Sequence, residues 1–238
     1  MRNILFITIA TILIFVAVSY VYGRSLWVPV YQQLSGKRSV EDIVQHYGAE
    51  VDLRLKPYFD KAGVNYPPKT ITLLAIKSEQ RLELWSNEGD RPTFIRDYPI
   101  QAASGVLGPK LREGDKQVPE GIYQLAYLNP NSSYHLSLKV NYPNAFDQKY
   151  AAIEGRDTPG TNIFIHGKAV SIGCLAMGDS AIEELFVLAA KTGISNVAVA
   201  IAPTDPRIAN LENTTEKAWV DVLYNDLTHF FKPYQGGV

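Results

Sequence analysis

Residues 164–179 read FIHGKAVSIGCLAMGD and hold the only cysteine of the 238-residue chain, Cys174, eight positions after His166. Gly167 and Gly173 stand beside these two side chains. A thiol becomes a nucleophile near neutral pH when a base lies within hydrogen-bond reach, and a short glycine-rich loop can bring the two groups together. We therefore predict that Cys174 is a nucleophile and His166 its base. The alternative is a small buried cysteine and an ordinary polar histidine at a strand end.

The residues on either side of this stretch predict a strand before it and a helix after it. Residues 161–165 (TNIFI) form a short β-branched run that is typical of a strand and would deliver His166 at its end. Ser180 and Glu183 fit the capping box that opens a helix, and Gly193 fits its C-terminal cap. The cysteine would then lie just ahead of a helix N-terminus. Free N–H groups and the helix dipole would favour a thiolate there, or the oxyanion of a tetrahedral intermediate.

The order of these features resembles the catalytic motif of the L,D-transpeptidase (YkuD-type) family, in particular its YafK-like branch. The motif is carried here by His166, Gly167, Ser171, Gly173, Cys174 and Met177. Residues 108–123 and 141–144 are similar to the family as well, so the resemblance spans most of residues 70–203. Two positions depart from the pattern: Ile172 stands where many members have a second histidine, and Ala176 where an arginine is common.

The resemblance implies an α+β fold in which a mostly antiparallel, sandwich-like sheet is flanked by helices. It also implies a cell-wall enzyme that attacks the peptidoglycan stem peptide at the carbonyl of its third residue, a diamino acid. Cys174 would form a thioester with His166 as general base and acid, and the Gly167 carbonyl would orient the imidazole. We expect the backbone N–H groups near Gly173 and Cys174 to stabilise the oxyanion.

Three outcomes are open for such a site. Resolution of the thioester by an amine is transpeptidation. Resolution by water is amidase or peptidase action, which in the YafK-like branch can release a lipoprotein linked to peptidoglycan. The third hypothesis is a wall-binding module that no longer catalyses a reaction. The presence of both Cys174 and His166 argues against it.

Four further residues are candidates for substrate contact. Residues 134–140 alternate between apolar even positions and polar odd positions, so the polar face of this expected strand could hold the peptide, with His135 as its best candidate. Arg156 could hold a substrate carboxylate with its planar fork or pin its own loop by a salt bridge. Lys110 lies in a loop that packs beside the cleft in the similar family. Ser171 is expected to order the catalytic loop rather than to act chemically.

The N-terminal residues 4–22 (ILFITIATILIFVAVSYVY) contain no charge. At about 1.5 Å per residue such a helix spans roughly the hydrocarbon layer of a bilayer. We expect one transmembrane helix that anchors the protein in the inner membrane, with the catalytic domain in the periplasm. The alternative is a signal peptide cleaved near residues 17–19, which would release the protein to the periplasm.

The whole chain divides into four expected segments. They are a membrane anchor (1–24), a linker with helical segments (25–68), the catalytic domain (69–205) and a C-terminal helix packed on it (206–238). A net charge of −1 gives no basic excess for binding nucleic acid, and one cysteine excludes an intrachain disulfide. The sequence contains no nucleotide-binding loop or metal-ligand cluster, so we expect neither cofactor nor metal.

Overall fold

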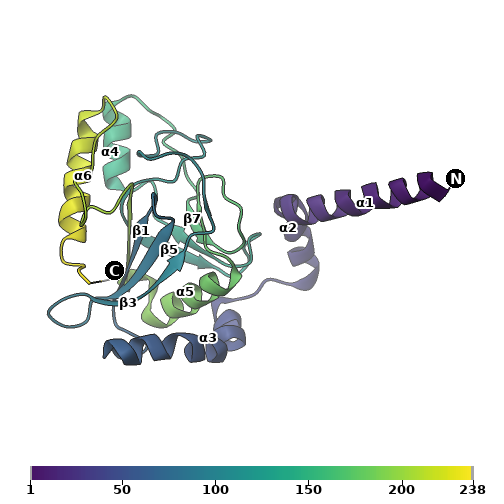
Figure 1. Ribbon diagram of the computed structural model, residues 1–238, viewed down its shortest axis with the longest axis horizontal. Coiled ribbons are helices and arrows are strands. Elements are labelled where there is room, and N and C mark those ends of the chain that lie inside the picture. The colour runs from purple at the N-terminus through teal and green to yellow at the C-terminus, as the bar shows by residue number, and fades with distance from the viewer. Residues whose placement is uncertain (1, 237–238) are drawn as a thin grey trace.

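The structure, a computed structural model, describes residues 2–236. Met1 and residues 237–238, which fall in the first and last expected segments, lie outside the described residues. The described chain forms one sheet in the order β3-β2-β1-β9-β5-β6-β7-β8-β4, with helices around it (Figure 1). The strands are β1 (Ile71–Ile76), β2 (Arg81–Ser86), β3 (Thr93–Pro99), β4 (Ala102–Ala103), β5 (Gly121–Asn129), β6 (Ser137–Val140), β7 (Phe164–His166), β8 (Leu175–Ala176) and β9 (Val197–Ala202). The helices are α1 (Arg2–Tyr22), α2 (Arg24–Ser35), α3 (Val40–Ala62), α4 (Ala145–Ile153), α5 (Asp179–Thr192) and α6 (Ala218–Phe231), with a 3-10 turn at Ile194–Asn196.

The sheet is mostly antiparallel, as expected for the mixed α+β class. Among the described strands, only the pairs β1–β9 and β7–β8 are parallel. The predicted α+β fold with a mostly antiparallel sheet is therefore confirmed.

Helices cover the sheet on both faces, and β1 explains why. Every residue of β1 is buried, so this strand needs a cover on each side. Leu73 belongs to the larger core that includes α3 and α5, whereas Leu74 belongs to a second cluster formed with α6. Figure 1 shows α6 on one side of the sheet and α5 with α3 on the other. The central strands are thus held rigidly between two apolar layers.

The helix α3 is one continuous element within the segment that was expected to be a linker with helical segments. It begins after Ser39, whose hydroxyl accepts a hydrogen bond from the N–H of Asp42, and ends at Gly63 with a φ of +69°.

The helix α4 was not predicted. Its signal is the pair Asn144 and Asp147, which form a capping box at its start.

The start of α5 corrects the expected capping box. The N-cap residue is Gly178, and no side chain caps the helix. Ser180 and Glu183 instead accept hydrogen bonds from the guanidinium of Arg54 on α3 (Nη1 to Oγ 3.0 Å, Nη2 to Oε2 3.0 Å). The guanidinium of Arg54, which comes from another helix, therefore binds the two side chains that the local sequence pattern assigned to the cap.

The N-terminal helices lie to one side of the sheet. Figure 1 shows α1 extending away from the domain, and α2 begins the segment that was expected to be a linker with helical segments. The Nε of Arg24 donates to the carbonyl of Ser133 (2.7 Å), which ties α2 to the loop between β5 and β6. Within residues 2–236, no helix combines the length and the apolar character needed to cross a membrane, so the expected anchor is not supported.

A buried ion pair fixes the long loop before β5. Glu120 accepts hydrogen bonds from Nζ of Lys77 (2.8 Å), the N–H of Gly108 (2.7 Å) and the hydroxyl of Tyr224 on α6 (2.9 Å). A buried carboxylate is tolerated only when it is paired and hydrogen-bonded in this way. The cluster joins the loop to the end of β1 and to α6.

Candidate active site

His166 is the last residue of β7 and is almost fully buried, with 3% of its surface exposed. Its Nδ1 lies 2.6 Å from the carbonyl oxygen of Gly167. Because a carbonyl only accepts, Nδ1 carries the proton and Nε2 keeps its lone pair. The ring of Tyr134 lies 4.8 Å from the imidazole, centroid to centroid, and packs on it at a tilt of 34°. Burial lowers the pKa of His166 below its ordinary value, so the ring is neutral at pH 7 and can accept a proton at Nε2.

Cys174 lies directly before β8 and is half-buried. Its Sγ lies 3.7 Å from the carbonyl oxygen of Asn162. Burial raises the pKa of the thiol, while a backbone hydrogen bond from Phe164 and the charges of Lys139 and Lys110 act in the opposite direction. The resting cysteine is therefore a thiol that shares a cavity with a neutral imidazole, and its proton has to leave as the sulfur attacks.

One cavity of about 550 Å³ contains both reactive side chains. Its lining residues are Tyr22, Ala102, Tyr134, His166, Ala169, Val170, Ser171, Ile172 and Cys174. Parallel pairing of β7 and β8, with His166 opposite Ala176, explains why positions eight residues apart in the sequence share this space. Sequence reasoning missed the contribution of Tyr134, which was assigned to the apolar face of a strand.

The two glycines of the motif are required for different reasons. A Cβ at Gly167 would lie 2.7 Å from the carbonyl oxygen of Tyr134 and 2.8 Å from Oδ1 of Asp179, so no larger residue fits. Gly173 has a φ of +115°, a backbone conformation that side chains with a Cβ rarely adopt. Oδ1 of Asp179 also accepts the N–H of Lys168 (2.9 Å), which closes the base of the catalytic loop.

Ser171 organises the turn that presents the cysteine. Its Oγ accepts the N–H groups of Gly173 (3.3 Å) and Cys174 (3.1 Å) and donates to the carbonyl of Cys174 (2.7 Å). The two N–H groups that we predicted as oxyanion donors are thus engaged by this hydroxyl. An oxyanion that uses them has to share them with Ser171 or displace its side chain.

We predict that Ser171→Ala lowers kcat about ten- to hundredfold with little loss of global stability. The variant removes the hydroxyl that orders the turn, and misplacement of a nucleophile by a fraction of an ångström is costly. The measurement is turnover of a peptidoglycan stem peptide together with thermal unfolding. Ser78→Ala, at an exposed position after β1, is the matched control and should match the wild type. A kcat equal to or above the wild-type value would mean that the hydroxyl does not support the active geometry.

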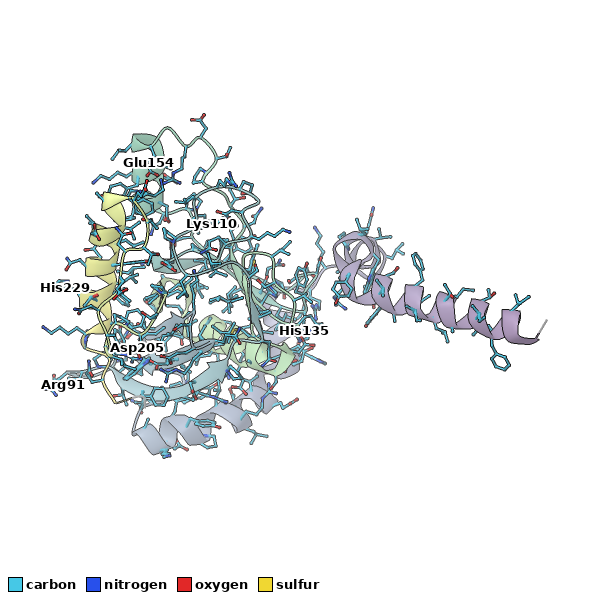
Figure 2. The ribbon with its side chains drawn as sticks, turned by 45° about the horizontal axis from the view of Figure 1, so that its top comes forward. Arg91, Lys110, His135, Glu154, Asp205 and His229 are labelled. Carbon is cyan, nitrogen blue, oxygen red and sulfur yellow. The ribbon has the colours of Figure 1, made fainter. Side chains whose placement is uncertain are left out.

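His135 lies outside the cavity. Its Nε2 is 2.9 Å from Oε1 of Glu183, and its ring packs edge-on against Tyr47. Figure 2 shows His135 near the helices α5 and α3. The residue has a φ of +77° and lies before the start of β6, so the alternation expected from residue 134 onward begins only at the strand itself. A substrate contact of His135 stays a prediction.

Lys110 and Arg156 also have partners within the protein. Lys110 is buried and forms an ion pair with Asp115, and its Nζ donates to the carbonyl of Arg112 (2.9 Å). Arg156 donates to Oε2 of Glu154 (2.6 Å) and to the carbonyl of Leu111 (2.7 Å). Figure 2 shows Lys110 in the loop region and Glu154 beside α4 and α6. Neither cation lines the cavity as described, and their substrate contacts stay predictions.

Metal-binding clusters are absent from the described part of the chain, where no three His, Cys, Asp or Glu side chains are arranged to hold an ion.

The comparison with protein families gives a match over more than half of the chain. The sequence model of the L,D-transpeptidase catalytic domain (YkuD) matches residues 71–200. This range begins at β1 and ends within β9, and it contains every residue that lines the cavity around Cys174 except Tyr22.

Individual relatives agree with this match. YafK of Escherichia coli (strain K12), named as a candidate L,D-transpeptidase, is 36% identical over 141 residues, which are 57% of this chain and 55% of YafK. The chain thus spans about half the length of that relative.

Solved structures with similarity include a mutant of the helical cell shape determining protein Pgp2 from Campylobacter jejuni. It has a TM-score of 0.48 and 22% identity, over 68% of this chain and 54% of that one. Bd1075 of Bdellovibrio bacteriovorus has a TM-score of 0.42 and 23% identity, over 68% and 56% of the two chains.

Proposed function

Because the chain belongs to the L,D-transpeptidase (YkuD) catalytic domain family, we propose that it is a peptidoglycan-modifying enzyme that transfers an acyl group through Cys174. The observation that carries this proposal is the neutral His166 with a free Nε2, in the same cavity as the thiol. A nucleophile and a base held by a third group, here the Gly167 carbonyl, form the constellation used in cysteine acyl transfer.

The first half of the reaction forms a thioester. Sγ attacks the peptide carbonyl as its proton passes to Nε2 of His166, so the C–S bond forms without a free thiolate in advance. The oxyanion is stabilised by the N–H groups of Gly173 and Cys174, once the Ser171 hydroxyl yields them. The imidazolium then gives its proton to the departing amine as the C–N bond breaks, and the imidazole becomes neutral again.

The second half returns the enzyme to its starting state. An acceptor amine or water attacks the thioester carbonyl and gives its proton to Nε2. The C–S bond breaks, and the proton returns from the imidazolium to sulfur. We propose transpeptidation as the reaction. Hydrolysis of the same thioester, including release of a lipoprotein from peptidoglycan, is the second candidate, and the half-exposed position of Cys174 favours it because water can reach the thioester.

The proposed substrate is the peptidoglycan stem peptide, cleaved at the carbonyl of the diamino acid at position three. The family match and the relative named as a candidate L,D-transpeptidase support this choice. Since peptidoglycan lies outside the cytoplasmic membrane, we propose that the domain acts there.

Product analysis tests this function directly. The full-length chain is incubated with defined tetrapeptide muropeptides and an excess of a free amine, and the products are read by mass spectrometry. A product joined to the amine through the diamino acid establishes transpeptidation, and products that have gained only water establish hydrolysis. An unchanged substrate under conditions in which the protein is folded would contradict the proposed function.

A further inference from the structure

The side chain of Lys139 lies near the thiol of Cys174 but does not line the cavity described above. Lys139 of β6 stands opposite Phe164 of β7 in the strand register. Its Nζ lies 2.7 Å from Oδ1 of Asn162 and 4.7 Å from the centroid of the Phe164 ring. The backbone carbonyl of Asn162 is the group that contacts Sγ of Cys174. One residue, Asn162, therefore touches both the ammonium group and the nucleophile.

Lys139 differs from Lys110, the other cation near the thiol, in forming no ion pair among the described residues. Lys110 is paired with Asp115, whereas Lys139 forms no ion pair with any residue in the described range 2–236. Glu113, which acts on Lys139 through its charge, uses its carboxylate to accept the N–H of Thr161 (2.7 Å). Partial burial lowers the pKa of Lys139. A partly desolvated cation without a counter-ion is stabilised when an anionic ligand binds beside it.

The groups around Lys139 suit a ligand that is both anionic and partly apolar. Asn162 is exposed and uses its Oδ1 for Lys139, so its amide NH₂ remains as a second donor. The Tyr127 ring meets that of Phe164 edge-on at 6.3 Å, and 46% of the Tyr127 surface is exposed. A carboxylate could thus accept from two donors while its carbon chain packs on the aromatic pair.

We propose that Lys139 and Asn162 form a carboxylate-binding subsite that positions the donor stem peptide next to Cys174. The inference rests on the proposed function for the identity of the ligand. Two carboxylates of the stem peptide lie close to the scissile bond, one on the departing fourth residue and one at the far end of the diamino acid. Both have the chemistry that this subsite recognises, and the experiment below distinguishes them.

Alkylation of Cys174 tests the anion site without any assumption about the enzyme reaction. Iodoacetate is anionic and iodoacetamide is neutral, and both alkylate the same sulfur. Any change in the pKa of the thiol alters both rates equally, so the ratio of the two rate constants isolates the attraction of an anion to the site. We expect Lys139→Met to lower this ratio about tenfold at low ionic strength, the effect of losing one charge-assisted hydrogen bond.

Two further variants control the alkylation experiment. Lys139→Arg keeps the charge and should keep most of the ratio, and Lys232→Met removes an exposed cation at the end of α6 and should leave the ratio unchanged. An unchanged ratio in a folded Lys139→Met variant would overturn the anion site, whether or not the protein acts on peptidoglycan.

Turnover of matched substrates then identifies the carboxylate. For the native tetrapeptide, Lys139→Met should raise KM at least tenfold and Lys139→Arg much less. The substrate in which the recognised carboxylate is replaced by a carboxamide should bind the wild type weakly and lose its dependence on Lys139. Equal dependence on Lys139 for the native substrate and for both carboxamides would overturn the substrate role, even with a lowered alkylation ratio. Absence of turnover in the wild type would count against the proposed function alone.

Discussion

Replacement of Cys174 by alanine should abolish turnover of the stem peptide, with a loss on the order of 10⁴-fold or more. The chain has no second thiol that could replace it. The change removes one half-buried sulfur whose polar contacts are a long interaction with the carbonyl of Asn162 and a backbone hydrogen bond from Phe164, so the fold should survive. The measurement is turnover at saturating substrate, together with the melting temperature of both proteins.

The Cys174→Ser variant tests whether activity depends on the thiol itself or only on the volume of the side chain at this position. Cys174→Ser keeps nearly the same volume but carries a hydroxyl of much higher pKa, so it should also be inactive. A Cys174→Ala protein that keeps a tenth of wild-type turnover would remove this residue as the nucleophile. Loss of activity accompanied by a large fall in melting temperature would instead assign Cys174 a structural role.

Replacement of His166 by glutamine should lower turnover by about 10²- to 10⁴-fold, the usual contribution of a positioned general base. The amide can keep a hydrogen bond to the Gly167 carbonyl but cannot take the proton from sulfur. The alkylation rate of Cys174 by iodoacetamide near neutral pH should fall as well. His229→Gln, on the exposed side of α6, is the matched control and should leave both rates unchanged.

The pH dependence of turnover gives a second test of His166. Burial holds its pKa below the ordinary histidine value, so the imidazole is neutral and active above that pKa and is protonated as the pH falls through it. The acid limb of the rate profile should therefore lie below pH 6.5, the ordinary pKa of histidine. The same limb should be absent from the residual activity of His166→Gln. An acid limb that persists unchanged in this variant would assign it to another group.

The local order of the catalytic stretch was predictable because its signals are short-range. The β-branched run before His166, the glycines beside the reactive side chains and the apolar spacing after residue 180 each act within a few residues. Boundaries within this stretch shifted by a few residues, as with β7, which begins at Phe164 rather than at residue 161. The mostly antiparallel sheet followed from the resemblance to the family.

Tertiary contacts decided the features that the sequence could not predict. The expected cap of α5 failed because Arg54, from a helix more than 120 residues away in the sequence, binds both Ser180 and Glu183. The sequence predicted a substrate-binding role for the polar face of residues 134–140, and that role stays a prediction. We chose His135 on that face because apolar and polar residues alternate from residue 134 onward, but the positive φ of His135 interrupts this alternation. Lys139, by contrast, lies within β6 and next to the thiol of Cys174. Neither the φ nor the partner of a side chain can be read from spacing alone.

Trapping of the acyl-enzyme tests the central claim most directly. The full-length protein is mixed with tetrapeptide muropeptide, quenched in acid within the first turnovers and analysed by intact mass and by peptide mapping. We expect a mass increase equal to the substrate minus its departing amine, located on the peptide that contains Cys174 and removed by hydroxylamine. Turnover without an adduct, or an adduct on any other residue, would contradict the proposed cysteine acyl transfer.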